Sequence, residues 1–238
     1  LLVGAIEASR KATESDKGNA AAYLRLGMAS RYLRRFEDAK RNITRSLSLQ
    51  PVNADCYREL ALLSVVEGDL DKAADNLAKA KSFDPKNPDT YFVGGLIHHF
   101  RQEYPEAGNS YQTSIDLGAH EYVVTAGYLS RVWDAQVNEN KTVSFFQKIL
   151  ERNPKDFASY YRIGQAYQVN GKVEDAKKFL EPGEKLAREA ADANQRDARS
   201  HVYRALFLAR LGDPTGDWEK EVNTATNLSS SDPEVFYK

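Results

Sequence analysis

The sequence predicts an all-α chain built from repeated pairs of antiparallel helices, and three observations support this prediction. Apolar and small residues recur three and four positions apart, as in amphipathic helices. Prolines end successive segments, since proline lacks an N–H and clashes with the preceding turn. Four columns of residues, too many to coincide by chance, repeat with a period of 34: Tyr23, Tyr57 and Tyr91; Ala39, Ala73 and Ala107; Phe36, Leu70 and Tyr104; Pro51 and Pro85.

The first complete unit, residues 20–53, illustrates the expected helix pair. Its two apolar stripes consist of Tyr23, Leu26, Gly27 and Ser30, then of Ala39, Ile43 and Ser46. A short polar break separates the stripes, and Pro51 ends the second one. We expect Gly27 and Ala39 to allow close approach of the two helices, with Tyr23 as the complementary side chain.

These units resemble the tetratricopeptide repeat (TPR), a helix–turn–helix family with the same period. The family pattern has an aromatic residue at place 4, Leu-Gly at places 7 and 8, Ala at 20 and 27, an aromatic or aliphatic residue at 24 and Pro at 32. The first unit matches through Tyr23, Leu26-Gly27, Ala39, Ile43 and Pro51, and a later one through Tyr160, Ile163-Gly164, Ala176 and Leu180. The resemblance implies a right-handed superhelical solenoid whose first helices line a concave groove.

The same alignment makes residues 1–238 a single TPR solenoid. Its units are expected at 20–53, 54–87, 88–121, 122–156, 157–197 and 198–231, the fourth and the last of them degenerate. In the fourth unit, Thr142 replaces the usual alanine. In 157–197 the second helix is long and contains Pro182-Gly183, so we expect it to be extended, kinked or broken. Residues 1–19 and 232–238 resemble half units, which suggests a fragment of a longer protein.

Composition limits the classes of function. Lys and Arg number 33 against 34 Asp and Glu, so the net charge is −1, and a nucleic-acid partner, which needs a basic surface, is not expected. No apolar run approaches the length of a membrane span. The single cysteine, Cys56, excludes a disulfide framework and a four-cysteine zinc site, and we expect it to be a buried packing residue. A cytoplasmic location is expected, because low cysteine use is compatible with a reducing compartment.

Signatures of catalysis are absent from the sequence. It holds no phosphate-binding loop, dinucleotide fingerprint, nucleophile elbow or zinc-protease helix, so neither an enzyme nor a cofactor is expected. Adjacent histidines, His98 and His99, stand out in "YFVGGLIHHFRQEYPEAGNSY". Neighbouring helical residues point about 100° apart, so the two cannot hold one metal ion from the same face. The alignment predicts that His98 packs between helices and that His99 faces the groove, as its wall or as a ligand contact.

The resemblance implies that places 2, 5, 9, 12 and 13 of each first helix line the groove. The residues expected to contact a partner are Leu24, Met28, Arg31, Arg58, Leu62, Phe92, Leu96, His99, Arg131, Tyr161, Gln165 and Gln168. The earlier of these are apolar with arginines and the later ones polar and aromatic, which favours a partner segment with apolar anchors and acidic residues. The competing interpretation is that Leu62, Val65 and Leu96 only pack against neighbouring units or a missing terminal helix.

We therefore expect a non-catalytic scaffold that presents its groove to a protein or peptide segment. The TPR arrangement that grips the C-terminal carboxylate of chaperones is not expected, because Leu24, Met28 and Glu59 occupy places that require lysine or asparagine. Two alternatives stay open at the level of sequence. One is a sensory or accessory arm of a larger multidomain enzyme, such as a bacterial signalling enzyme. The other is self-association through stacking of the solenoid ends.

Overall fold

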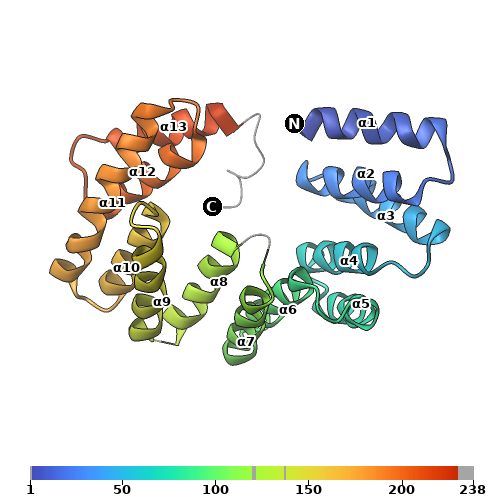
Figure 1. The fold of residues 1–238 in the computed structure, drawn as a ribbon, viewed down its shortest axis with the longest axis horizontal. Helices are drawn as coiled ribbons and strands as arrows, with labels where there is room; N and C mark the ends of the chain where they lie inside the picture. Colours follow the sequence, from blue (N-terminus) through green and yellow to red (C-terminus); the bar gives the residue numbers. More distant parts are fainter. Residues whose placement is uncertain (1, 120–121, 137, 230–238) are drawn as a thin grey trace. The chain divides into compact units, whose positions relative to one another are not determined.

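The computed structural model describes residues 2–119, 122–136 and 138–229, and its regular structure there is entirely helical (Figure 1). The helices are α1 (Leu2–Ser15), α2 (Ala20–Tyr32), α3 (Phe36–Leu49), α4 (Ala54–Glu67), α5 (Leu70–Phe83), α6 (Pro88–Phe100), α7 (Tyr104–Asp116), α8 (Tyr122–Ala135), α9 (Glu139–Arg152), α10 (Phe157–Val169), α11 (Val173–Ala193), α12 (Ala198–Leu211) and α13 (Asp217–Ser229). The all-α prediction is confirmed. Residues 232–238, expected to begin a further helix, lie outside the described residues.

The helices pack as consecutive pairs within two compact units, Leu1–Val132 (unit 1) and Trp133–Lys238 (unit 2), with the boundary inside α8. We call α2, α4, α6, α10 and α12 first helices, and the helix after each its second helix. Within unit 1, α4 contacts both α2 and α6, and within unit 2, α10 contacts α12. First helices therefore stack on first helices, which brings equivalent residues of successive pairs alongside one another.

An asparagine column begins the three first helices of unit 1. Asn19, Asn53 and Asn87 lie 34 residues apart, and their side-chain oxygens accept hydrogen bonds from backbone N–H groups at 3.0, 3.1 and 3.0 Å. Such N-caps satisfy donors that a helix start leaves without a partner inside the helix. The repeat therefore determines where these helices begin as well as which face they bury.

The tightest contact inside a helix pair joins place 8 of the first helix to place 24 of the second. A Cβ atom added at the glycine would lie 2.6, 2.4 and 2.4 Å from the facing side chain in the pairs Gly27–Ile43, Gly95–Tyr111 and Gly164–Leu180. The expected close approach of Gly27 and Ala39 is confirmed, since the same added Cβ would lie 3.2 Å from the Ala39 carbonyl oxygen. Tyr23 is not the complement there, because Ile43 occupies that place.

Helix α11 continues without interruption from Val173 to Ala193, through Pro182. The expectation of a break at Pro182-Gly183 is therefore wrong, whereas an extended helix is observed. The reason lies in packing: a Cβ added at Gly183 would lie 2.4 Å from Cζ of Phe207 and 2.8 Å from Cβ of Tyr160. Glycine permits this approach of α10 and α12, and the apolar burial around it offsets the weak helix preference of both residues.

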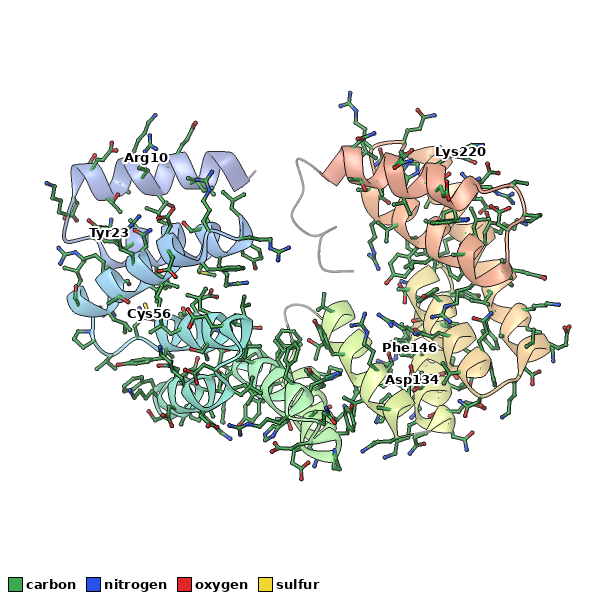
Figure 2. The ribbon with its side chains drawn as sticks, turned by 180° about the vertical axis from the view of Figure 1, so that it is seen from behind. Arg10, Tyr23, Cys56, Asp134, Phe146 and Lys220 are labelled. Carbon is green, nitrogen blue, oxygen red and sulfur yellow. The ribbon has the colours of Figure 1, made fainter. Side chains whose placement is uncertain are left out.

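Two small side chains expected at packing positions are fully buried. Thr142, which stands for alanine in the fourth unit, donates a hydrogen bond from Oγ1 to Oδ1 of Asp134 at 3.4 Å. Cys56 lies on α4 (Figure 2), and its thiol donates to Oγ of Ser46 at 3.3 Å. Burial raises the pKa of the Cys56 thiol, so this cysteine is a packing residue, as expected.

Candidate functional site

Packing within each unit covers most of the side chains expected to contact a partner. Four are buried, seven half-buried and one exposed: Leu24, Arg58, Leu96 and Tyr161; Met28, Arg31, Leu62, Phe92, His99, Gln165 and Gln168; and Arg131. Nine of them belong to unit 1, and the last three positions, from Tyr161 onward, belong to unit 2.

The apolar members of this set pack between the helix pairs of unit 1. Leu24 is part of a buried cluster, and Met28 packs against that cluster. Leu62, Val65 and Phe92 pack against a second buried cluster formed by α4, α5 and α6. The stacking of first helices explains this, because places 5, 9 and 12 of one first helix face the next. These side chains therefore contribute to packing between the helix pairs of unit 1.

The two predicted arginines of α2 and α4, Arg31 and Arg58, are paired with carboxylates inside unit 1. Arg31 donates from Nε to Oε2 of Glu59 at 2.7 Å, and both side chains are nearly buried. Nη2 of Arg58 lies 2.9 Å from Oδ1 of Asp55. The Arg31–Glu59 pair joins α2 to α4, whereas the Arg58–Asp55 pair lies within α4.

The two adjacent histidines have different surroundings. His98, expected to pack, is half-buried with Nδ1 2.6 Å from Oε2 of Glu103 in the turn after α6. His99, expected to face the groove, is half-buried near three rings, with centroid distances of 5.9, 6.4 and 6.0 Å to Tyr104, Tyr111 and Tyr128. Tyr128 lies on α8, so a helix outside the α6–α7 pair contributes to the surroundings of His99.

His99 provides a pH-dependent contribution to stability. Burial first, and the positive charge of Arg131 second, lower the pKa of His99 below its usual value of 6.5. Between the folded pKa and about pH 6.5 the unfolded chain therefore binds more protons, so the His99 contribution is complete above about pH 6.5 and is lost as the pH falls through the folded pKa.

We expect wild type to lose more stability than His99→Gln between about pH 7 and pH 5, measured as urea midpoints by circular dichroism. Both proteins contain the same carboxylates, so protonation of these groups contributes equally to the two pH slopes. His98→Gln serves as the control. Equal pH slopes for wild type and His99→Gln would contradict the assignment.

Place 13 of first helices α2, α4 and α6 in unit 1 is exposed and apolar. Tyr32, Val66 and Phe100, 34 residues apart, are 40, 55 and 60% exposed at the C-terminal ends of α2, α4 and α6. Because α4 contacts α2 and α6, these equivalent side chains form a row across unit 1, which we call the apolar stripe. Sequence reasoning named place 13 but assigned no residue to it. The signal was the 34-residue spacing of the three apolar side chains.

A connected polar cluster surrounds Tyr161 in unit 2. Arg210 donates from Nε to Oη of Tyr161 at 3.2 Å and from Nη1 to Oε1 of Gln168 at 3.3 Å. Arg162 donates from Nη1 to Oε1 of Gln165 at 3.2 Å. We call these five residues the Tyr161 cluster. It includes all three predicted residues of unit 2. Arg162 was missed because it stands at place 6, outside the expected groove places, and Arg210 because no residue was assigned at its place 13.

One carboxylate faces this cluster. Asp134, on α8 in Figure 2, is half-buried, and burial raises the pKa of its carboxyl. The charge of Arg162, the hydrogen bond from Thr142 and the charge of Arg210 oppose that rise, in this order of strength. Both guanidinium groups lie over the ring of Tyr161, with Cζ atoms 5.8 and 5.6 Å from its centroid. Asp134 is therefore coupled more strongly to Arg162 than to Arg210.

Two other kinds of site are absent from the described helices. No group of three His, Cys, Asp or Glu residues in the described ranges could hold a metal ion. Every helix among the same residues is too short or too polar to cross a membrane.

Comparison with known proteins gives the same fold. Family models described as tetratricopeptide repeat match residues 24–88 and 145–178. No curated protein matches the chain. Three similar solved structures are those of MamA protein (22% identity over 74% of this chain and 95% of that one, TM-score 0.58), of pilF from Pseudomonas aeruginosa (18%, 91% and 90%, TM-score 0.61) and of YrrB, described as a TPR protein with an unusual peptide-binding site (20%, 76% and 93%, TM-score 0.54).

At these identities, similarity to solved structures shows the fold, and the two family-model matches show the repeat type of the segments they cover. Both agree with the helix pairs, the glycine contacts and the 34-residue columns described above. This chain contains tetratricopeptide repeats, within residues 24–88 and 145–178.

Proposed function

We propose that this chain is a non-catalytic scaffold that binds a protein or peptide segment on the face formed by its first helices. TPR proteins generally mediate interactions with proteins or peptides, and one similar structure is described by its peptide-binding site. The observation that carries the proposal is the apolar stripe. Single exposed apolar side chains are ordinary, but three at equivalent places of contiguous helices form a regular row, and apolar side chains gathered on one face are typical of interaction sites.

The stripe also suits an extended partner with apolar side chains at regular intervals. Packed helices lie about 8–10 Å apart, and an extended chain advances about 3.3 Å per residue. An apolar side chain at roughly every third residue of the partner would therefore meet successive members of the stripe. We propose that half-buried Met28, Leu62 and Phe92 border this surface. The free thiol of Cys56 suits a reducing compartment, and a cytoplasmic location remains part of the proposal.

The test begins with selection of a random library of 12-residue peptides on the whole 238-residue chain. Affinities of the enriched peptides are then measured by fluorescence anisotropy for wild type and for Val66→Ser and Phe100→Ser. We expect each variant to lower the affinity of stripe-binding peptides by about tenfold, because a large apolar contact is lost.

The matched control is Val52→Ser, since Val52 is a valine that is 65% exposed but lies in the turn between α3 and α4. Its affinities are expected to equal those of wild type. A library without enriched peptides would overturn the scaffold proposal, and enriched peptides insensitive to both stripe variants would overturn the assignment of the stripe. The far-ultraviolet circular dichroism of every variant should be unchanged.

A further inference from the structure

The charges of unit 2 are divided between its first and second helices. First helices α10 and α12 contain four arginines and no Asp or Glu: Arg162, Arg199, Arg204 and Arg210. Second helices α11 and α13 contain nine acidic residues against five Lys and Arg. The whole chain is nearly neutral, so its balance hides a local excess of positive charge on the first helices.

Three of these arginines face carboxylates within unit 2. Arg199 Nη2 lies 3.8 Å from Oδ1 of Asp156, and Arg204 Nη1 lies 2.6 Å from Oε1 of Glu221. Arg162 is the positive charge that acts most strongly on the carboxyl of Asp134. These carboxylates balance the charges of Arg199, Arg204 and Arg162 inside the helix stack.

Arg210 differs from the other three in the groups that hold it. Its guanidinium donates to neutral acceptors, the hydroxyl of Tyr161 and the amide oxygen of Gln168. Neutral acceptors fix the position of a guanidinium without cancelling its charge. Asp134, the carboxylate that faces the cluster, is coupled first to Arg162 and only more weakly to Arg210. The positive charge of Arg210 is therefore mostly uncompensated within the cluster.

Packing holds this cluster in place. The ring of Tyr161 is buried and meets the rings of Tyr203 and Phe207 edge-on, at centroid distances of 6.1 and 5.6 Å. Gln168 is fixed at both ends, because its Nε2 also donates to the Arg210 backbone oxygen at 2.9 Å. A charged group held in advance by such contacts spends little conformational entropy when it binds a ligand.

We propose that the Tyr161 cluster binds an acidic side chain of an extended peptide segment, with Arg210 as the main contact and Arg162 beside it. This inference rests on the proposed scaffold function and names the chemistry of its partner in unit 2. Charge complementarity selects the occupant: an Asp or Glu carboxylate accepts hydrogen bonds from guanidinium N–H groups and cancels the charge of Arg210. The Nε2 group of Gln165 supplies donors suited to a backbone carbonyl of the same segment.

The experiment uses the 12-residue library on the whole chain, followed by counter-selection on Arg210→Gln. The probes are synthetic copies of the surviving peptides with amidated C-termini, so that side chains are their only carboxylates. We expect survivors to contain Asp or Glu, to lose about tenfold in affinity when that residue becomes Asn or Gln, and to bind Arg210→Gln with a similar loss. Added salt should weaken binding to wild type more than to Arg210→Gln.

The matched control is Arg188→Gln, which removes the same charge from an exposed position of second helix α11, and it should bind like wild type. Peptides that keep their affinity when Asp or Glu becomes Asn or Gln would overturn the proposal. It would also be overturned if every enriched peptide bound Arg210→Gln, so that counter-selection left none. Tighter binding of a twelve-nucleotide thymidine oligomer than of any acidic peptide would point to nucleic acid instead. If the stripe variants weaken other peptides while Arg210→Gln has no effect, only this inference fails and the scaffold function stands.

Discussion

Phe207→Ala is expected to lower the free energy of unfolding of unit 2 by about 3–5 kcal/mol, the largest effect of any single truncation considered for this chain. Phe207 is fully buried at the centre of the cluster formed by Tyr161, Leu180, Ala187 and Tyr203. Its ring fills the space that Gly183 leaves open. Alanine would remove that ring and leave a cavity that the surrounding helices cannot close without moving.

The measurement combines urea unfolding, followed by circular dichroism, with amide hydrogen exchange. Exchange should accelerate in α10, α11 and α12, while helices of unit 1 keep their wild-type protection, because stability in repeat arrays is largely local. Phe100→Ala is the matched control: the same substitution at a ring that is 60% exposed should change stability by less than about 0.5 kcal/mol. A loss below about 1 kcal/mol for Phe207→Ala would contradict the packing described.

Two neighbouring glycines of α6 are expected to respond in opposite directions to alanine. Gly95→Ala should cost about 1–3 kcal/mol, because its Cβ would lie 2.4 Å from two ring carbons of Tyr111, a stiff side chain that is itself fully buried. Gly94→Ala should be neutral or stabilising by up to about 1 kcal/mol, because its Cβ would meet Cδ2 of Leu77 at 3.4 Å, and alanine favours a helix over glycine.

Unfolding in urea measures both variants against wild type. A double variant isolates the contact: Gly95→Ala should cost nearly nothing in a Tyr111→Leu background, where the flexible leucine can turn away. Equal effects of Gly94→Ala and Gly95→Ala, or an unchanged cost of Gly95→Ala in the Tyr111→Leu background, would show that helix propensity and not the ring contact decides the outcome.

The fold followed from sequence because its signals are local and repeated. Helical spacing, the column Ala39, Ala73 and Ala107, and the prolines at unit ends are properties of short segments. Each repeat has the same pattern as its neighbour, so a unit with a weak match can be aligned through the clearer units beside it. The prediction failed at Pro182, where local preference disfavours a helix but contacts of Gly183 with Phe207 and Tyr160 are made only in three dimensions.

The candidate site followed from sequence only in part, because exposure is not a property of a segment. Place numbers selected Leu24, Leu96 and Arg58, and packing buries all three. Place 13, to which no residue was assigned, holds Phe100, which the fold leaves exposed, and Arg210, which reaches Tyr161 across 49 residues of chain. Whether a side chain on a first helix is buried or exposed depends on the helix beside it.

By itself, the amino-acid sequence determined that this chain forms helix pairs with a 34-residue period, that Gly27 marks a close helix contact, and that Cys56 is a packing residue. Only the tertiary structure decided that His99 lies among tyrosine rings, that the apolar stripe is open, and that Arg162 and Arg210 share one tyrosine. The physical reason is that helix formation depends on neighbours along the chain. Burial and charge compensation depend on neighbours in space, which the stacking of the repeats supplies.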